Sequence, residues 1–93
     1  MTRIIADFSG IFIFSELSKA PCHGYQLRKT IRQKTGHLPN IGQIYPILYR
    51  YEKLGFLKSH FERNWRGQHI KVYELTEKGK KTAQQIKAII STL

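Results

Sequence analysis

Hydrophobic residues near the start of the chain recur at steps of three and four residues, which predicts a helix over residues 1–20. Pro21 ends this helix, because proline has no amide proton to donate and disfavours helical backbone at the residue before it. The apolar stripe of the helix comprises Ile4, Phe8, Ile11 and Phe12, and it is widened by Ile5, Ile13 and Phe14. One small core requires a narrower stripe. We therefore expect part of this helix to face a second subunit.

Two more helices are predicted before residue 55. Leu27 and Ile31 lie one turn apart among several cations, which indicates a helix over residues 23–35 that ends at Gly36. Asn40 is a favourable N-cap for a helix over residues 41–54. The expected inner face of that third helix consists of Ile44, Ile47, Leu48 and Tyr51. A rotation of about 100° per residue then places Gly42, Tyr45, Pro46, Tyr49, Arg50 and Lys53 on its far side.

Pro46 bears on where the third helix begins, because a proline inside a helix costs up to about 3 kcal/mol. Two compatible interpretations follow. In the first, the helix starts near Gly42, so that Pro46 lies close to its first turn. In the second, the helix bends at Pro46 and aims Gln43, Tyr45 and Tyr49 at base edges.

Two short runs rich in aromatic and β-branched residues, 56–63 and 69–75, predict a β-hairpin over residues 56–75. Thr76 is a favourable cap for a last helix over residues 77–92. The apolar side of that helix carries Ala83, Ile86, Ile90 and Leu93. The predicted fold is thus one mainly helical α+β domain over residues 1–93. Three helices followed by a hairpin is the order of a winged helix-turn-helix, whose third helix enters the DNA major groove beside a hairpin wing.

The charge is large and unevenly placed. Sixteen Lys and Arg residues against six Asp and Glu give a formal charge of +10, and residues 1–22 contribute none of it, with two charges of each sign. A field of this size attracts a polyanion, for which DNA, RNA and an anionic membrane face are the candidates. A surface that only maintains solubility usually carries less charge and mixes the signs better.

Other functions have little support in the sequence. No segment approaches the roughly 20 uninterrupted apolar residues of a membrane span, and the first apolar stretch lacks the features of a signal peptide. The single cysteine, Cys22, excludes an intramolecular disulfide, fits a reducing cytoplasm and is interpreted as a small buried apolar residue. No spacing of His, Cys and acidic residues is typical of a metal site, so we expect no metal and no cofactor. The acids are scattered and no nucleophile or phosphate-loop motif is present, so we do not expect an enzyme.

Three ordered segments resemble motifs of the PadR-type winged-helix transcriptional regulators. Residues 21–27, Pro-Cys-His-Gly-Tyr-Gln-Leu, are similar to the family's opening of the second helix, in which a proline, a variable residue and His-Gly-Tyr-Glu-Leu follow one another. Residues 42–48, Gly-Gln-Ile-Tyr-Pro-Ile-Leu, resemble its Gly-Thr-Ile-Tyr-Pro-Leu-Leu recognition helix. Residues 71–79, Lys-Val-Tyr-Glu-Leu-Thr-Glu-Lys-Gly, resemble the end of its wing and the start of the next helix. The resemblance covers about residues 10–82.

The resemblance implies a homodimeric DNA-binding regulator, usually a repressor of nearby genes. Some members release DNA when a small molecule binds at the dimer interface, and whether this chain takes such an effector stays open. Members generally continue into a longer helical region, whereas 17 residues follow Thr76 here, so we expect the dimer to rely on the first and last helices. The expected dimer interface comprises Ile4, Phe8, Ile11, Phe12, Ile86, Ile90 and Leu93.

The candidate DNA contacts fall into three groups. On the recognition helix they are Asn40, Gln43, Tyr45, Tyr49, Arg50 and Lys53. On the wing they are Arg66, Gln68, His69 and Lys71, and on the second helix Arg28 and Arg32, the last two at phosphates. Gln43 can form paired hydrogen bonds with adenine and Arg50 with guanine, whereas Lys53 suits a phosphate. Arg66 suits a narrow minor groove.

Two aromatic residues keep alternative roles. Tyr45 either contacts DNA or packs against the second helix. Trp65 is a wedge into DNA or a lid on the hairpin, and the lid is the favoured interpretation. The family tends to have a wing turn rich in glycine and arginine with proline, whereas residues 64–71 here read Asn-Trp-Arg-Gly-Gln-His-Ile-Lys.

The sequence therefore predicts a sequence-specific double-stranded DNA-binding transcriptional regulator, a repressor that acts as a homodimer on a pseudo-palindromic operator. We expect it in the cytoplasm, at the nucleoid, in a prokaryotic or viral context. One alternative is an architectural or replication-associated DNA-binding protein with no dedicated operator. A second alternative is a winged-helix adaptor for protein or RNA, although the basic face of the third helix is unlike an apolar docking surface.

Overall fold

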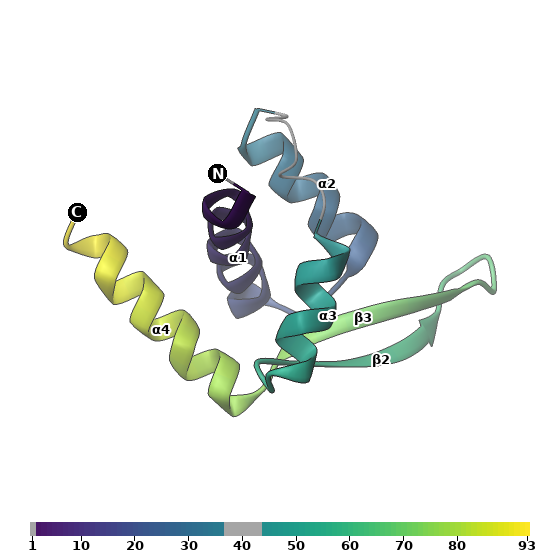
Figure 1. Ribbon diagram of the computed structural model, residues 1–93. Helices are drawn as coiled ribbons and strands as arrows, with labels where there is room; N and C mark the ends of the chain where they lie inside the picture. The colour runs from purple at the N-terminus through teal and green to yellow at the C-terminus, as the bar shows by residue number, and fades with distance from the viewer. Residues whose placement is uncertain (1, 37–43) are drawn as a thin grey trace.

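The computed structural model describes residues 2–36 and 44–93, and of residues 2–8 it describes the helical backbone alone (Figure 1). Its helices are α1 (Thr2–Lys19), α2 (Gly24–Lys34), α3 (Tyr45–Lys53) and α4 (Glu77–Ser91). Its strands are β1 (Cys22–His23), β2 (Leu57–Arg63) and β3 (His69–Leu75). The predicted mainly helical α+β winged-helix fold is confirmed. The hairpin of β2 and β3 projects from the three packed helices, and α4 leads away on the opposite side (Figure 1).

The core lies where α1, α2 and α3 meet the base of the hairpin. Its buried apolar members come from all of these elements: Ile13, Phe14, Leu17, Leu27, Ile31, Ile44, Ile47, Leu48, Leu57, Tyr73 and Leu75. Burying one large apolar side chain stabilises a fold by about 1.5–3 kcal/mol relative to leaving it exposed. The residues that hold the helices together therefore also fix the base of the wing to them.

The contact between α1 and α3 is close. A Cβ atom on Gly10 of α1 would overlap the Tyr51 hydroxyl of α3. The ring centroid of Tyr51 lies 5.3 Å from that of Phe14, in a tilted pair, and 5.9 Å from that of Phe56, in an edge-to-face pair. Aromatic rings prefer such arrangements. The buried face of α1 thus includes Ile13 and Phe14, which the sequence pattern treated as a widening of the stripe.

The second helix begins close to its expected start. The predicted range was 23–35, and α2 covers Gly24–Lys34 with His23 as its N-cap. The ring Nδ1 of His23 accepts a hydrogen bond from the amide of Gln26 at 3.2 Å. This bond satisfies one of the amides that a helix N-terminus leaves without an intrahelical partner. Gly36 follows the helix with φ 67°, the left-handed conformation expected of a glycine there.

The start of the third helix corrects the prediction. The predicted range 41–54 begins too early, because α3 starts at Tyr45 and its N-cap is Ile44, which makes no side-chain capping bond. Asn40, the expected N-cap, lies outside the described residues. Pro46 falls in the first turn, where its missing amide proton breaks no intrahelical hydrogen bond. The expected position of Pro46 in the first turn is therefore confirmed, while Gly42, the expected start of the helix, lies outside the described residues.

A short strand that the sequence pattern did not predict precedes α2. Cys22 pairs with Tyr73 and His23 with Val72, so that an antiparallel sheet forms in the order β1-β3-β2. Two residues are too few to show the alternation of apolar and polar positions that predicts a strand. Only the pairing with β3 defines β1. This pairing ties the start of α2 to the wing. Cys22 is partly buried against the core, and burial, together with the charge of Glu16, raises the pKa of its thiol.

The start of α4 is fixed to the base of the wing. The Thr76 hydroxyl accepts a hydrogen bond from the amide of Gly79 at 3.1 Å and donates one to the carbonyl oxygen of Gly55 at 2.5 Å. The amide of Thr76 donates to the Phe56 carbonyl oxygen at 3.0 Å. A Cβ atom on Gly79 would overlap that same carbonyl oxygen. Because Gly79 has no side chain, the first turn of α4 packs directly against the backbone of the residues that precede β2.

A cluster of charges joins α1 to α2. Glu16 is partly buried and forms ion pairs with Lys34 of α2 and, at 3.3 Å, with Lys19 of its own helix. Burial alone would raise the pKa of Glu16, but the hydrogen bonds from the two ammonium groups outweigh it and lower the pKa. The carboxylate is therefore charged at neutral pH and stabilises the contact between the two helices.

Candidate nucleic-acid interface

The outward face of α3 carries polar and aromatic side chains over two turns. Tyr45, Tyr49, Arg50 and Lys53 are exposed there, while Ile47 and Leu48 on the opposite side are buried. The periodicity of 3.6 residues per turn explains this division. The Lys53 ammonium lies 4.9 Å from the centroid of the Tyr49 ring, which places a positive charge over an aromatic face.

The wing has two faces of different charge. Residues paired directly across two antiparallel strands project to the same side of the sheet. The pairs Ser59 with Tyr73, Phe61 with Lys71, and Arg63 with His69 therefore share one side, here called the α3 face of the wing. The pairs Lys58 with Glu74, His60 with Val72, and Glu62 with Ile70 share the other side, here called the acidic face. Both acids of the two strands thus lie on the acidic face.

Contacts with α3 show which side of the wing lies next to it. The Ser59 hydroxyl donates a hydrogen bond of 2.6 Å to Glu52 Oε2, and Lys71 Nζ lies 3.5 Å from Glu52 Oε1. Glu52 belongs to α3, so the α3 face of the wing continues the surface formed by the exposed side chains of that helix. Burial alone would lower the pKa of Lys71, but Tyr73 and Glu52 raise it on balance, so Lys71 is protonated at neutral pH.

The cations on the two faces differ in their partners. On the acidic face, Lys58 lies 3.6 Å from Glu74, and His60 lies 2.5 Å from Glu62. By contrast, neither Arg50 nor Lys53 of α3 nor Arg63 of the wing forms an ion pair with any residue whose side chain the structure describes. The positive charges on α3 and on the wing face beside it are therefore available to an anion.

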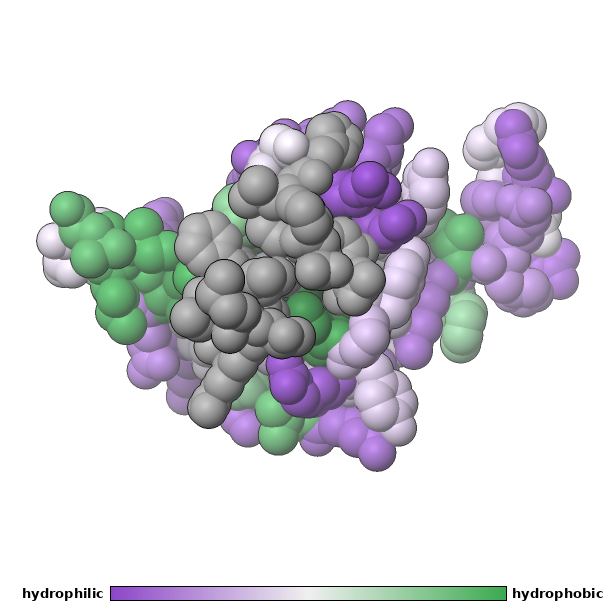
Figure 2. Space-filling model, turned by 45° about the horizontal axis from the view of Figure 1, so that its top comes forward, coloured by the Kyte–Doolittle hydropathy of each residue, from purple (hydrophilic) through white to green (hydrophobic). Residues whose placement is uncertain are grey.

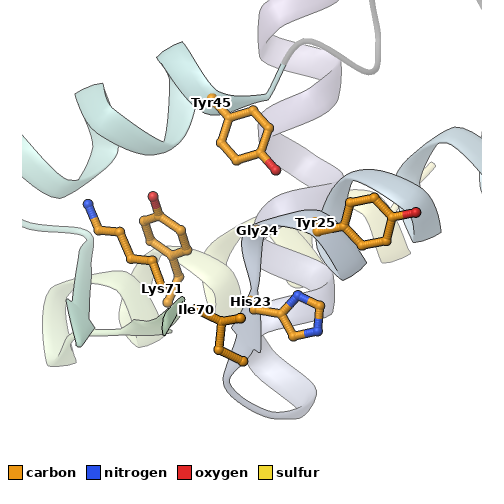
Figure 3. Close-up of a pocket in the computed structure, with 7 residues that line it drawn as sticks. His23, Gly24, Tyr25, Tyr45, Ile70 and Lys71 are labelled. Carbon is orange, nitrogen blue, oxygen red and sulfur yellow. The ribbon is translucent and has the colours of Figure 1, made fainter. Parts of the chain in front are cut away.

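A hollow of about 320 Å³ lies between these elements. It is lined by His23, Gly24, Tyr25, Tyr45, Ile70, Lys71 and Tyr73. Figure 3 shows Tyr45 descending from α3 towards the start of α2, while Lys71 extends from β3 towards α3. Hydroxyl and ammonium donors thus border the hollow, and they suit the oxygen atoms of a phosphate better than an apolar ligand.

Gly24 couples two of the sequence motifs in space. A Cβ atom on Gly24 would lie 2.8 Å from Cε1 of Tyr45, closer than real Cβ contacts allow. The ring of Tyr45 therefore crosses the start of α2 where the absence of a side chain makes room. Tyr45 therefore packs against α2, as one interpretation expected, while 48% of its surface stays exposed. Its contact with DNA stays a prediction.

The chain also matches known proteins. The Transcriptional regulator PadR-like family matches residues 13–85, which include α2, α3 and the wing. This chain belongs to the PadR-like family. The family consists of transcriptional regulators, which agrees with the prediction that the chain is not an enzyme. Among curated protein sequences there is no significant match.

Solved structures support the assignment to the PadR-like family. A protein from Thermoplasma acidophilum, solved as a candidate transcriptional regulator, is 36% identical, with a TM-score of 0.77 over 98% of this chain and 94% of that chain. A PadR family transcription regulator from Clostridium difficile R20291 is 30% identical, with a TM-score of 0.76 over 87% of this chain and 84% of that chain. Bacillus subtilis PadR, solved in complex with operator DNA, is 25% identical, with a TM-score of 0.68 over 81% of this chain and 44% of that chain.

At the tip of the wing, Trp65 does not have the position that was expected of it. Trp65 is 87% exposed, so it does not cover the hairpin, and its interpretation as a lid is wrong. Gln68 has a structural contact: its side-chain oxygen accepts a hydrogen bond of 3.2 Å from Asn64. Arg66 is exposed, and its guanidinium carbon lies 4.7 Å from the Trp65 ring.

The remaining predicted contacts are placed as follows. Asn40 and Gln43 lie outside the described residues. Arg28 and Arg32 lie one turn apart on α2 and are partly buried. Arg63 was not predicted as a site residue, although strand alternation from Lys71 and His69 would have found it once the register between the strands was known.

The predicted dimer residues divide into two groups. The side chains of Ile4 and Phe8 lie outside the described part of the structure, while Ile11 is partly buried and Phe12 and Ile86 are packed against the core of their own subunit. Ile90 and Leu93 of the α4 end are 45% and 99% exposed, and the unpredicted Ile89 is 63% exposed. Figure 2 shows this end of α4 as a hydrophobic region well separated from the hydrophilic wing.

Two other kinds of site receive no support from the described residues. Among them, no group of three or more His, Cys, Asp or Glu side chains is placed to hold a metal ion. None of the helices, as far as they are described, is long and apolar enough to cross a membrane.

Proposed function

We propose that this PadR-family regulator binds a pseudo-palindromic operator in duplex DNA as a homodimer and represses transcription by occluding the promoter. The observation that carries the proposal is the separation of charge on the wing: Arg63, His69 and Lys71 lie on the face that contacts α3, and both acids of the two strands lie on the other face. A duplex has one negative charge per about 1.7 Å of its axis and fits such a surface. The complex of Bacillus subtilis PadR with operator DNA supports the same use of this fold.

In this proposal, α3 enters the major groove. Tyr45, Tyr49 and Arg50 face the bases, with Arg50 suited to the two acceptors of a guanine edge. Lys53, at the far end of the helix, neutralises a phosphate. Gln43 and Asn40 precede α3 in the chain and remain proposed contacts on the strength of the sequence.

The wing then lies beside the neighbouring minor groove. Arg66 at its tip is attracted by the negative potential of a narrow groove. Arg63, His69 and Lys71 on the α3 face neutralise phosphates. Arg63 has the larger role, because Lys71 is already paired with Glu52 and must exchange that partner for a phosphate.

Arg28 and Arg32 complete the proposed phosphate contacts. They lie one turn apart on α2, whose first residues, Gly24 and Tyr25, border the hollow beneath α3. A strand of DNA that crosses this hollow passes the start of α2, so its phosphates come within reach of the cations further along that helix. These contacts position the protein and carry no sequence information.

The proposed dimer places two copies of α3 about one helical turn of DNA apart. The exposed apolar residues Ile89, Ile90 and Leu93 at the end of α4 support an interface there. Ile4, Phe8, Ile11 and Phe12 of α1 are proposed to complete it, since α1 packs beside α4. Ile86 contributes through its outer edge, because it is packed partly against the core of its own subunit.

The test is a selection of binding sites from a pool of random duplexes by the purified protein at about 150 mM salt. The proposal predicts enrichment of an inverted repeat. Retention of duplex DNA with no enriched motif would favour an architectural role instead. Absence of any retained duplex would contradict DNA binding altogether and leave the adaptor role.

A further inference from the structure

Trp65 is the single tryptophan of the chain and lies at the tip of the wing with 87% of its surface exposed. A tryptophan side chain has roughly 150–250 Å² of surface to bury, most of it apolar, and tryptophan is enriched at interfaces. The wing tip is also the part of the hairpin farthest from the packed helices (Figure 1). The indole is therefore presented to whatever the wing meets.

The turn that carries Trp65 is held by other residues. The amide of Gly67 donates to the Asn64 carbonyl oxygen at 2.9 Å, and the amide of Asn64 donates to the Gln68 carbonyl oxygen at 2.9 Å. The Asn64 side-chain oxygen also accepts bonds from the amides of Arg66 at 3.0 Å and Gln68 at 2.9 Å. Trp65 and Arg66 are thus the two central residues of a closed β-turn.

Gly67 completes the turn with φ 76°, a conformation that a glycine adopts without strain. Because Asn64 and Gly67 fix the loop, the indole of Trp65 is not required to close the hairpin. A rigid turn also loses little conformational entropy when its central side chains contact a partner. The exposed indole is therefore better explained by a contact outside the subunit than by the local structure.

The neighbour of Trp65 indicates the chemistry of that contact. The guanidinium carbon of Arg66 lies 4.7 Å from the centroid of the indole ring, so a flat apolar group and a positive charge project together. The minor groove of DNA attracts arginine through its negative potential. Proteins that bind the minor groove frequently insert an apolar side chain between adjacent base pairs, which unstacks the pairs in part and kinks the duplex.

We propose that Trp65 is a wedge that inserts from the minor groove between two base pairs of the bound duplex, guided by Arg66. The proposal rests on the DNA binding proposed above and adds a deformation of the DNA to it. Pyrimidine–purine steps unstack most easily, so the wedge also confers a preference for such a step at a position where no side chain reads a base edge.

The experiment uses a duplex recovered by selection and labelled with fluorescein, so that anisotropy measures binding independently of Trp65. The emission of Trp65, the only indole, reports its own environment in the same samples. We expect quenching of the indole by stacked bases and protection from acrylamide on binding. Stacking of an aromatic side chain on a base is worth enough that Trp65→Ala should weaken binding about 5- to 150-fold. Trp65→Phe, which keeps a flat ring, should retain most of the affinity.

Energy transfer between dyes at the two ends of the duplex measures the kink. The wild type should shorten the distance between the ends, and Trp65→Ala should leave the duplex straighter once enough variant is added to saturate it. Lys87→Ala, at an exposed position on α4, is the matched control and should alter neither affinity nor bending.

The outcomes separate the wedge from the function beneath it. Failure of the wild type to bind any duplex overturns the DNA-binding proposal itself. Normal binding with unchanged indole emission, or with unchanged affinity and end-to-end distance in Trp65→Ala, overturns the wedge alone. Protection of the indole from acrylamide as the protein concentration rises without DNA would assign Trp65 to a protein contact and would also overturn it.

Discussion

Replacing Arg63 or Lys58 by alanine removes one positive charge from opposite faces of the same strand. Either variant lowers the formal charge of the chain from +10 to +9. The two residues differ in their surroundings, because Lys58 lies 3.6 Å from Glu74 on the acidic face, whereas Arg63 is exposed on the α3 face beside His69. Arg63→Ala should therefore weaken DNA binding, and Lys58→Ala should leave it nearly unchanged.

The size of the effect follows from counterion release. Each neutralised phosphate contributes about 0.9 to the slope of log K against log salt concentration, so the loss of one contact in each subunit of a dimer lowers the slope by about 1.8. Between about 50 and 200 mM salt, a fourfold change, the affinity gap between wild type and Arg63→Ala should shrink roughly tenfold. A monomeric complex would show about half that change in slope.

The assay is the anisotropy of a fluorescein-labelled selected duplex, titrated with each protein at four or more salt concentrations. Thermal unfolding of both variants without DNA controls for misfolding, and both side chains lie where their removal leaves no cavity in the core. If Arg63→Ala and Lys58→Ala had equal slopes of log K against log salt concentration, the wing would have no preferred face for DNA. A lower slope for Lys58→Ala alone would place DNA on the acidic face and refute the reasoning.

Three further results are expected. Gly79→Ala should destabilise the fold by about 2–4 kcal/mol. The new methyl group would overlap the Phe56 carbonyl oxygen, and a backbone atom cannot move aside as a flexible side chain can. A loss of stability below about 1 kcal/mol in urea denaturation would contradict this contact. Glu16→Gln should lower the melting temperature at neutral pH. Because the folded-state pKa of Glu16 is depressed, its stabilisation is present above the ordinary pKa and is lost as the pH falls through the folded-state value. The difference in melting temperature between the two proteins should therefore narrow as the solution is acidified, and a difference that stays constant would refute the role of the Lys34 pair. Arg50→Ala should weaken binding to the selected operator more than to random duplex, and an equal loss on both would count against base readout by Arg50.

Local periodicity was sufficient to predict the orientation of the third helix. The spacing of Ile47 and Leu48 placed their opposite face outward, and the structure agrees, because a core-facing stripe needs no knowledge of distant residues. The start of the same helix was missed. Asn40 is a good capping residue by type, but Ile44 occupies the N-cap without any side-chain bond, so there was no capping signal in the sequence to find.

Features that depend on pairing between distant segments could not be read from the chain. The strand β1 is two residues long and is defined by Cys22 and His23 meeting β3 some fifty residues later. Arg63 joins the candidate surface only because the register sets it opposite His69. Trp65 was misinterpreted as a lid, because composition alone does not show that the hydrogen bonds of Asn64 already close the turn.

Hydroxyl-radical and methylation footprinting of the protein on its selected duplex tests the central claim most directly. If α3 of each subunit enters a major groove beside its wing, two sets of guanine N7 atoms should be protected about 10 base pairs apart, on one side of the duplex. The flanking minor grooves should be protected from hydroxyl radicals where the wings lie. Protection spread evenly along the duplex, or confined to a single groove, would contradict the account of a dimeric regulator that recognises its operator through α3 and the wing.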